Sequence, residues 1–298
     1  MSEIKRVLIV GGTHGNELIG VYTNRRFEQN PDLIRRPHLE VLTLFGNPQA
    51  IAANTRYIDE DLNRCFAAPI AEPSTHLNYE MQRVAAIRNE FGPSGRTPVD
   101  FIIDQHGTTS NAGLMLILDQ LDAFTLNLAA YLSTLQPEIK VYSSTNSGRK
   151  QDSLRSIAPY RIGIEVGPVA HGTLHAELFQ NNQALIYAIL DYLEQYNCDN
   201  GTVHQSALTL YQYVGKVDYP KDETGAVLAM IHPHLQFKDY QPLNPGDPML
   251  LTFDGETIAY QGDSTVYPVF INEAAYYEKG IAMCLTQKQH IHLDAPLP

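Results

Sequence analysis

The stretch Val7-Leu-Ile-Val-Gly-Gly-Thr-His-Gly-Asn-Glu17 decides the fold of the N-terminal half of the chain. Its first four residues are apolar and mostly β-branched, which is typical of a strand buried on both faces of a parallel sheet. The strand ends at a Gly-Gly pair, and residues 18–27 then predict a helix. His14 and Glu17 therefore lie in the turn between them, where both side chains could point at one ion. Zinc accepts such nitrogen and oxygen ligands but needs a third protein ligand.

Two other interpretations of this turn are a helix cap without a ligand and a loop that binds a dinucleotide. The dinucleotide fingerprint needs Gly-x-Gly-x-x-Gly, so that the backbone can approach the pyrophosphate. Here Thr13 occupies the third position of that pattern, and Glu17 would place a negative charge close to the phosphates. No Gly-x-x-x-x-Gly-Lys-Ser/Thr motif is present in the sequence either. The pattern therefore disfavours a nucleotide-binding module.

Length, charge and cysteine content narrow the class of protein. The chain has 298 residues, enough for a large core and for two domains. Its formal net charge of −12 disfavours nucleic acid and anionic membranes as partners, because both attract basic surfaces. The three scattered cysteines predict neither a disulfide framework nor a cysteine-based zinc site. We find no signal peptide and no apolar run long enough to span a bilayer, so the expected location is the cytoplasm.

A second histidine follows a second apolar strand. Residues 98–104 predict a buried strand, and Gln105-His106-Gly107 comes directly after it. In open α/β sheets, functional sites gather beyond the carboxyl ends of the strands. If the two strands are neighbours, His14, Glu17 and His106 can converge, and such a set matches the ligands of catalytic zinc. The alternative for His106 is a histidine that is hydrogen-bonded within the core.

Two more stretches hold polar groups in unusual places. Residues 54–66 are dense in Arg, Asp and Asn, and this density indicates either a binding loop or a self-paired surface loop. Glu165 lies between Ile164 and Val166 in a strand-like run, where a buried carboxylate is costly unless it has a partner or a role. It is either a general base near a metal or a glutamate on a sheet edge that faces water.

The remaining pattern predicts an α/β part followed by a β-rich part. Helices are expected at residues 76–91, 120–135 and 174–197, and further strands at 39–45, 113–118 and 161–168. From about Gly201 the chain has short strand-like runs separated by Pro and Gly turns, at residues 208–217, 226–231, 249–253 and 267–271. We therefore predict two domains, at residues 1–200 and 201–298.

Five motifs, in order along nearly the whole chain, resemble the aspartoacylase family, which belongs to a group of zinc carboxypeptidase-like amidohydrolases that includes succinylglutamate desuccinylase. The motifs are Gly11-Gly-Thr-His-Gly-Asn-Glu17, Arg56-Tyr-Ile-Asp-Glu-Asp-Leu-Asn-Arg64, Asp104-Gln-His-Gly-Thr-Thr-Ser-Asn111, Ile164-Glu-Val-Gly-Pro168 and the run from Tyr267 to Lys279. The resemblance implies an N-terminal catalytic domain with a mixed sheet flanked by helices. It also implies a smaller C-terminal β-rich domain that caps the active-site mouth, and it leaves a homodimer as a possible assembly.

The resemblance also implies a role for each matching residue. His14, Glu17 and His106 correspond to the ligands of one zinc ion per chain, Glu165 to the catalytic base, and Arg56 to the arginine that polarises the scissile carbonyl. Asn63 and Arg64 correspond to the pair that holds the α-carboxylate of the amino acid, Arg155 to the arginine that binds the aspartate side chain, and Tyr276 to a tyrosine from the C-terminal domain.

The activity implied is hydrolysis of an N-acyl-L-aspartate, most simply of N-acetyl-L-aspartate to acetate and L-aspartate. The alternative is a related aminoacylase that acts on N-acetylated aromatic or other neutral amino acids, for which a cation at Arg155 has no use. The chain departs from the animal aspartoacylases at two positions: Gln151 replaces a tyrosine, and Gly107 replaces the asparagine after the metal histidine. The first leaves the details of substrate binding open, and the second leaves the zinc ligand in place.

Overall fold

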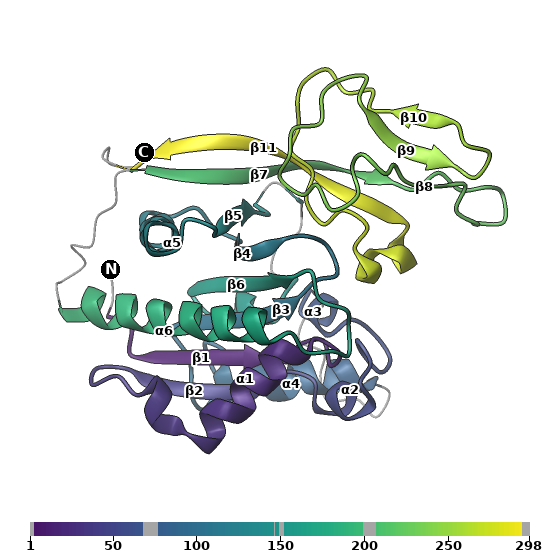
Figure 1. Ribbon diagram of the computed structural model, residues 1–298. Helices are drawn as coiled ribbons and strands as arrows, with labels where there is room; N and C mark the ends of the chain where they lie inside the picture. The colour runs from purple at the N-terminus through teal and green to yellow at the C-terminus, as the bar shows by residue number, and fades with distance from the viewer. Residues whose placement is uncertain (1–2, 68–76, 146, 149–151, 199–206, 294–298) are drawn as a thin grey trace.

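An eight-stranded mixed sheet forms the centre of the molecule (Figure 1). This computed structural model describes residues 3–67, 77–145, 147–148, 152–198 and 207–293. The strands lie in the order β11-β7-β5-β4-β6-β3-β1-β2. Their bounds are Arg6–Gly11 (β1), Glu40–Phe45 (β2), Phe101–Gly107 (β3), Gly113–Leu118 (β4), Lys140–Ser143 (β5), Tyr160–Gly167 (β6), Ala207–Asp218 (β7) and Ile281–His292 (β11). All neighbours are parallel except β4 with β6 and β7 with β11.

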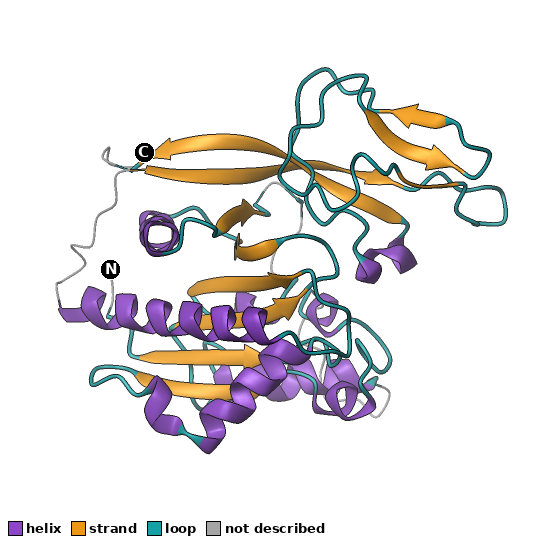
Figure 2. Cartoon of the chain, in the orientation of Figure 1, coloured by secondary structure: helices purple, strands orange, loops and turns teal. Residues whose placement is uncertain are grey.

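Helices cover both faces of this sheet, as Figure 2 shows. On one face lie α1 (Leu18–Gln29), α5 (Ala123–Leu135) and α6 (Ala176–Cys198), and on the other α3 (Leu62–Cys65) and α4 (Tyr79–Phe91). The shorter elements are α2 (Pro48–Ala53) and the 3-10 turns η1 (Pro31–Ile34), η2 (Leu154–Ile157) and η3 (Ala274–Lys279). None of the helices in the described ranges is long and apolar enough to cross a bilayer.

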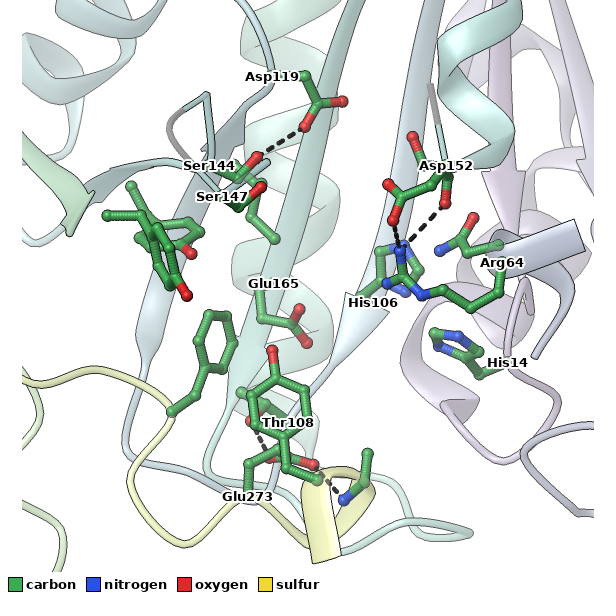
Figure 3. Close-up of a pocket in the computed structure, with 18 of the residues that line it drawn as sticks. His14, Arg64, His106, Thr108, Asp119, Ser144, Ser147, Asp152, Glu165 and Glu273 are labelled. Atoms are coloured by element: carbon green, nitrogen blue, oxygen red, sulfur yellow. Dashed lines mark hydrogen bonds and ion pairs between the residues drawn. The ribbon is translucent and has the colours of Figure 1, made fainter. Parts of the chain in front are cut away.

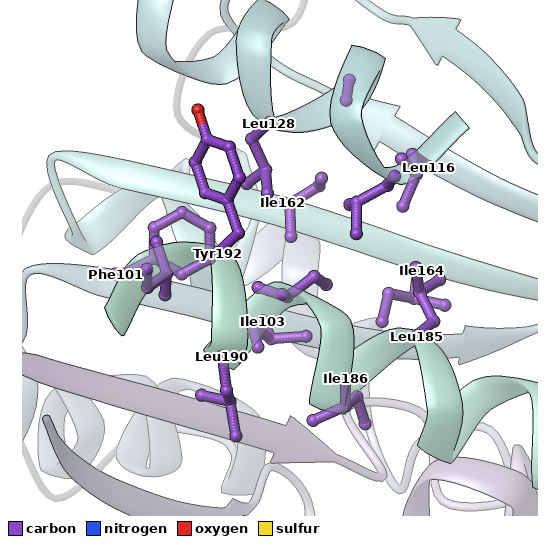
Figure 4. Packing of buried hydrophobic residues seen from close by; sticks show 14 of the residues in the cluster. Phe101, Ile103, Leu116, Leu128, Ile162, Ile164, Leu185, Ile186, Leu190 and Tyr192 are labelled. Carbon is purple, nitrogen blue, oxygen red and sulfur yellow. The ribbon is translucent and has the colours of Figure 1, made fainter. Parts of the chain in front are cut away.

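Strand β1 explains why the sheet is covered on both sides. Val7 and Ile9 belong to the larger core cluster, whereas Leu8 and Val10 belong to the smaller one, because successive side chains point to opposite faces. Figure 4 shows the larger cluster, in which Ile103 and Ile162 of the sheet pack against side chains of α6 such as Ile186. Burial of this apolar surface is the main force that holds the two layers together.

The C-terminal part is rich in strands, as predicted. β8 (Ala229–Ile231), β9 (Pro248–Thr252) and β10 (Thr257–Ala259) form a separate antiparallel sheet with its own apolar cluster. β7 and β11 instead extend the central sheet, because β7 pairs with β5. The structure confirms the predicted α/β class with a smaller β-rich part. The domain boundary at residues 200/201 falls outside the described residues and stays a prediction.

The prediction of a strand at residues 267–271 is wrong. Within this segment only Val269 makes a bridge, an isolated one to Cys284. Phe270 has φ +56° and Asn272 has φ +59°, and such left-handed backbone cannot continue a strand. β11 was not expected from the sequence, because Gln287 to His290 expose their side chains and lack the alternation that marks a half-buried strand.

Candidate active site

His14, Glu17 and His106 lie together at the carboxyl edge of the central sheet. β1 and β3 are parallel neighbours, with Gly11 opposite Gln105, so the turn after β1 meets the last residues of β3, which include His106. One ligand atom from each of the three side chains lies within 4.8 Å of the other two, and all three residues are buried. We call this group the metal end of the site.

Both imidazole rings turn the same nitrogen inward. His14 Nδ1 lies 2.7 Å from Glu17 Oε1, and His106 Nδ1 lies 2.9 Å from Glu17 Oε2. Each Nε2 instead faces a buried carboxylate behind the ring, at 3.2 Å for Asp61 and 2.8 Å for Asp104. Metal-binding histidines commonly donate their second ring N–H to a carboxylate, which fixes the ring and increases the basicity of the ligand. This donor set therefore fits a divalent cation between the two Nδ1 atoms and Glu17.

The electrostatics of the metal end favour a bound cation. Burial on its own would raise the pKa of Glu17, but His14 and His106 lower it well below its ordinary value. Burial would likewise lower the pKa of His106, but the charges of Asp104 and Glu17 raise it well above normal. The surrounding negative charge thus favours a cation at this ring, and a metal bound there would displace a proton from it. The backbone N–H of Gly107 also donates to Glu17 Oε2 at 3.2 Å. The carboxylate is therefore kept ionised, as a metal ligand must be.

Arg56 reaches the same group from the loop before α3. Its Nη1 donates to Glu17 Oε1 at 3.0 Å, and its Nη2 lies 3.4 Å from Asp61 Oδ2. Desolvation would lower the pKa of Arg56, but these two carboxylates raise it. The Nε atom is buried and has no hydrogen-bond partner among the described residues. A buried unpaired N–H is costly, so this guanidinium retains a capacity to bind that a ligand could use.

Glu165 projects from β6 into the space beside the metal end (Figure 3). It lies opposite His106 in the β3–β6 register and is only 8% exposed. Burial raises the pKa of Glu165 to about 8, and the neighbouring His106 only partly offsets this effect. The carboxyl group can therefore hold or release a proton near neutral pH, as a general acid or base must.

A second group of charged residues lies further along the same face of the sheet. Arg155, on η2, donates from Nε to Asp119 Oδ2 at 2.7 Å and from Nη2 to Asp119 Oδ1 at 2.9 Å. Its Nη1 lies 3.4 Å from Asp104 Oδ2. Arg161 makes a longer ion pair with Asp119, at 3.5 Å. We call Arg155, Asp119 and Arg161 the arginine end of the site.

Two further residues tie neighbouring loops together. Arg64 forms an ion pair with Asp152, visible as dashed lines in Figure 3. Asn63, buried beside it, accepts a hydrogen bond from the backbone N–H of Leu154 at 2.8 Å. Helix α3 and the start of η2 therefore meet at this point. A substrate carboxylate that binds Arg64 would have to share it with Asp152.

One cavity of about 730 Å³ joins both ends. It is large enough for a small amino-acid derivative. Tyr276 of η3 enters it from the C-terminal part and packs on Phe270, with ring centroids 5.7 Å apart. All residues predicted for the site line this cavity: His14, Glu17, Arg56, Asn63, Arg64, His106, Arg155, Glu165 and Tyr276.

Sequence reasoning missed the carboxylates that hold these groups. Asp61 and Asp104 carried a signal, because each lies inside a motif that was already singled out. Asp119 follows β4, whose antiparallel course beside β6 no local pattern reveals. Glu273 accepts hydrogen bonds from Thr109 N at 2.7 Å and from Ser110 N at 3.2 Å. It thereby fixes the loop after β3 to the C-terminal part.

The two departures from the family pattern have different outcomes. Gln151 lies outside the described residues. Gly107 donates its N–H to Glu17, which any residue could do, and a Cβ there would lie 3.5 Å from Val169, an ordinary contact. Glycine is therefore not required by space at this position, and the metal end does not depend on the side chain that follows His106.

The fold and the site define an α/β protein with a candidate metal centre next to a buried carboxyl group and several arginines. Residues 3–193 match the model of the succinylglutamate desuccinylase/aspartoacylase catalytic domain. Residues 206–288 match the AstE/AspA barrel-sandwich hybrid domain. The chain therefore belongs to the succinylglutamate desuccinylase/aspartoacylase family, as its motifs predicted.

Individual relatives carry names that imply different substrates. The chain is 52% identical to a probable aspartoacylase of Nostoc over 98% of its length and 99% of the relative's. It is 39% identical to a human N-acyl-aromatic-L-amino acid amidohydrolase over 96% of its length and 91% of the relative's. The crystal structure of murine aminoacylase 3 superposes with a TM-score of 0.92 at 36% identity and covers the whole of both chains. The fold and the hydrolase class are thus shared, and the choice of substrate has to be argued from the cavity.

Proposed function

We propose that this chain is a zinc-dependent deacylase of N-acyl-L-aspartate. The simplest reaction is N-acetyl-L-aspartate plus water giving acetate plus L-aspartate: the amide C–N bond breaks, hydroxide adds to the acyl carbon, and the amine gains a proton. One observation carries the proposal. The buried guanidinium of Arg155 lines the same cavity as Glu165 and the His/Glu/His group, as a substrate with an acidic side chain requires.

The metal end supports the choice of zinc. Two imidazole nitrogens and one carboxylate are a ligand set typical of catalytic zinc, which keeps a further position open. When bound there, zinc would act as a Lewis acid on the amide carbonyl and make water more acidic. The carboxylates behind His14 and His106 would hold both rings in the orientation that ligation needs.

Glu165 is assigned the proton transfers. In its ionised form it takes a proton from the attacking water, and in its protonated form it delivers that proton to the leaving amine. A pKa raised by burial serves both halves of this cycle. A cation at the metal end would lower that pKa, because opposite charge favours the ionised carboxylate.

The arginines and Tyr276 are assigned to the substrate. Arg56 supports the negative charge that develops on the carbonyl oxygen, a contribution often worth roughly 3–4 kcal/mol for a well-placed donor. Arg64 and Asn63 hold the α-carboxylate that every N-acyl amino acid carries. Arg155 holds the carboxylate that only an acidic side chain supplies, because a planar guanidinium matches carboxylate geometry. Tyr276 closes the cavity from the C-terminal part.

The competing function is deacylation of N-acetylated aromatic or other neutral amino acids. Such a side chain carries no carboxylate that could pair with the arginines at this end of the cavity. A panel of N-acetylated amino acids, assayed with zinc-loaded enzyme, separates the two functions. We expect N-acetyl-L-aspartate to have the highest kcat/KM, and a preference for N-acetyl-phenylalanine would overturn the proposal. Location in the cytoplasm and assembly as a homodimer stay predictions.

A further inference from the structure

Three residues of β6 lie on the same face of the strand, and the outer two, Arg161 and Glu165, line the cavity. Arg161, Gly163 and Glu165 alternate with the core residues Ile162 and Ile164, because side chains of a strand point alternately to opposite faces. A Cβ at Gly163 would lie 3.2 Å from Cζ and Nη1 of Arg155. The bare backbone of Gly163 is therefore the surface against which the guanidinium of Arg155 rests, between Arg161 and Glu165.

Arg155 does not present a free positive charge to the cavity. Two of its nitrogens donate to the two oxygens of Asp119, at 2.7 and 2.9 Å, which is a bidentate pair. The third nitrogen faces Asp104 at 3.4 Å. Burial raises the pKa of Asp119 on its own, but Arg155 lowers it, so the carboxyl group is ionised near neutral pH. The pair Arg155–Asp119 is therefore formally neutral and alone would attract a second carboxylate only weakly.

Arg161 supplies the missing positive charge. Its Nε lies 3.5 Å from Asp119 Oδ2, too far for a good hydrogen bond but close enough for strong Coulomb attraction. That Nε is buried and has no hydrogen-bond partner among the described residues, while Nη1 donates to Ala158 O at 3.1 Å. Asp122 also acts on Arg161, but its two oxygens accept hydrogen bonds from Thr125, and it does not line the cavity. Two guanidinium groups and one carboxylate give the arginine end a formal charge of +1. Asp104 is counted at the metal end, because its Oδ2 is nearer to His106, at 2.8 Å, than to Arg155.

We propose that Arg161 is a positioning residue for acidic substrates: it compensates Asp119, so that Arg155 can bind the side-chain carboxylate of the substrate. Arg161 acts through Asp119 and does not touch the reacting atoms. This inference rests on the proposed deacylation of N-acyl-L-aspartate. It adds that selectivity for a dianion depends on the net charge of Arg155, Asp119 and Arg161 together. Arg155 alone does not determine it.

A charge cycle tests this inference in the zinc-loaded, full-length enzyme. The variants are Arg161→Leu, Arg161→Lys, Asp119→Asn and the double variant Asp119→Asn with Arg161→Leu. They set the formal charge of the arginine end to 0, +1, +2 and +1. The measurements are kcat and KM for N-acetyl-L-aspartate and for the neutral-side-chain substrate N-acetyl-L-methionine, at low and high salt. Arg83→Leu is the matched control, because Arg83 is also half-buried but binds backbone carbonyls outside the cavity.

We expect Arg161→Leu to raise KM for N-acetyl-L-aspartate by about tenfold or more, the scale of a lost unit charge at short range in a protein. kcat should change little, because Glu165 and the metal end are unaltered. Arg161→Lys should stay within a few-fold of the wild type. The double variant should recover most of the KM lost in Arg161→Leu, because its net charge is +1 again. Values for N-acetyl-L-methionine should change little in Arg161→Leu and in the Arg83→Leu control.

Two results would overturn the inference. Equal losses for the acidic and the neutral substrate in Arg161→Leu would show a general structural role. The second result is a double variant with a higher KM for N-acetyl-L-aspartate than Arg161→Leu. The two substitutions would then each weaken binding, whereas charge balance predicts that the second restores it. In either case a wild-type preference for N-acetyl-L-aspartate would leave the proposed function standing. A wild-type preference for aromatic substrates would instead overturn the proposed function itself.

Discussion

The two ends of the cavity use the same arrangement with opposite net charge. At the metal end, the basic side chains of His14 and His106 are each backed by a carboxylate, and Glu17 adds a third negative group. At the arginine end, one carboxylate, Asp119, lies between two guanidinium groups. The excess is therefore negative where a cation would bind and positive where an anion would bind.

This difference shows how a chain of net charge −12 can receive a dianion. Long-range attraction is not available, so binding has to come from local charge in a cavity with little water. At each end, carboxylates hold the basic side chains in place by hydrogen bonds and neutralise part of their charge. Asp104 connects the two ends, because its Oδ2 lies 2.8 Å from His106 and, at the longer distance of 3.4 Å, also faces Arg155.

The largest effect should come from removing a ligand at the metal end. His14→Ala or His106→Ala should lose both the metal and the activity, because two remaining ligands seldom retain zinc. The zinc content of the purified variants measures this loss. We expect about one zinc per chain in the wild type. His290→Ala, an exposed histidine of β11, is the control and should keep both. Stoichiometric zinc in either ligand variant would show that the ligand assignment is wrong.

The next largest effect concerns the group between the two ends. Glu165→Gln keeps the shape of the side chain but cannot accept a proton, so kcat should fall by roughly 10²–10⁴ while zinc is retained. In the wild type the base works only when ionised, so kcat should drop as the pH falls through the pKa of Glu165. That pKa is about 8 without a bound cation, and a metal would move the midpoint lower. If the variant turned over at a near-normal rate and its kcat still fell at low pH, Glu165 would be excluded as the base.

Breaking the arginine end should affect substrates unequally. Arg155→Leu should lower kcat/KM for N-acetyl-L-aspartate by about 10²–10³, because a charge-assisted bidentate contact is lost and Asp119 then faces the incoming carboxylate. N-acetyl-L-methionine should be affected much less. Steady-state kinetics with both substrates decides the point. Losses of the same size for both would contradict the division of the cavity into two ends.

The residue shared by both ends gives the smallest effect of this series. Asp104→Asn should weaken zinc binding by about 10–100-fold, the usual consequence of changing the group that orients a ligating histidine. Because Asp104 also faces Arg155, the selectivity for an acidic substrate should change in the same variant. Zinc titration against a competing chelator and the kinetic ratio of the two substrates measure the two effects. A change in only one of them would show that the ends are independent.

Local pattern predicted that His14, Glu17 and His106 come together, because they lie at the ends of strands that are apolar and easily recognised. The run Val7–Val10 and the strand before His106 each carry the signal within a few residues, and the parallel pairing of β1 with β3 brings them together. The sequence predicted only one of the three residues of the arginine end. Arg155 was named by family resemblance, whereas Asp119 and Arg161 meet it only because β4 runs antiparallel to β6. Such pairing depends on contacts across the sheet that no short stretch of sequence encodes.

Gly163 has a consequence for how substrate range could change during evolution. A methyl group there would lie 3.1 Å from Cβ of Ile117, next to the backbone of β4, and 3.2 Å from the guanidinium of Arg155, which lies at the end of a longer side chain. The arginine would have to yield, while Glu165, two residues along the strand, could keep its place. One added carbon atom at Gly163 is thus expected to displace a charged group of the arginine end while the metal end keeps its geometry.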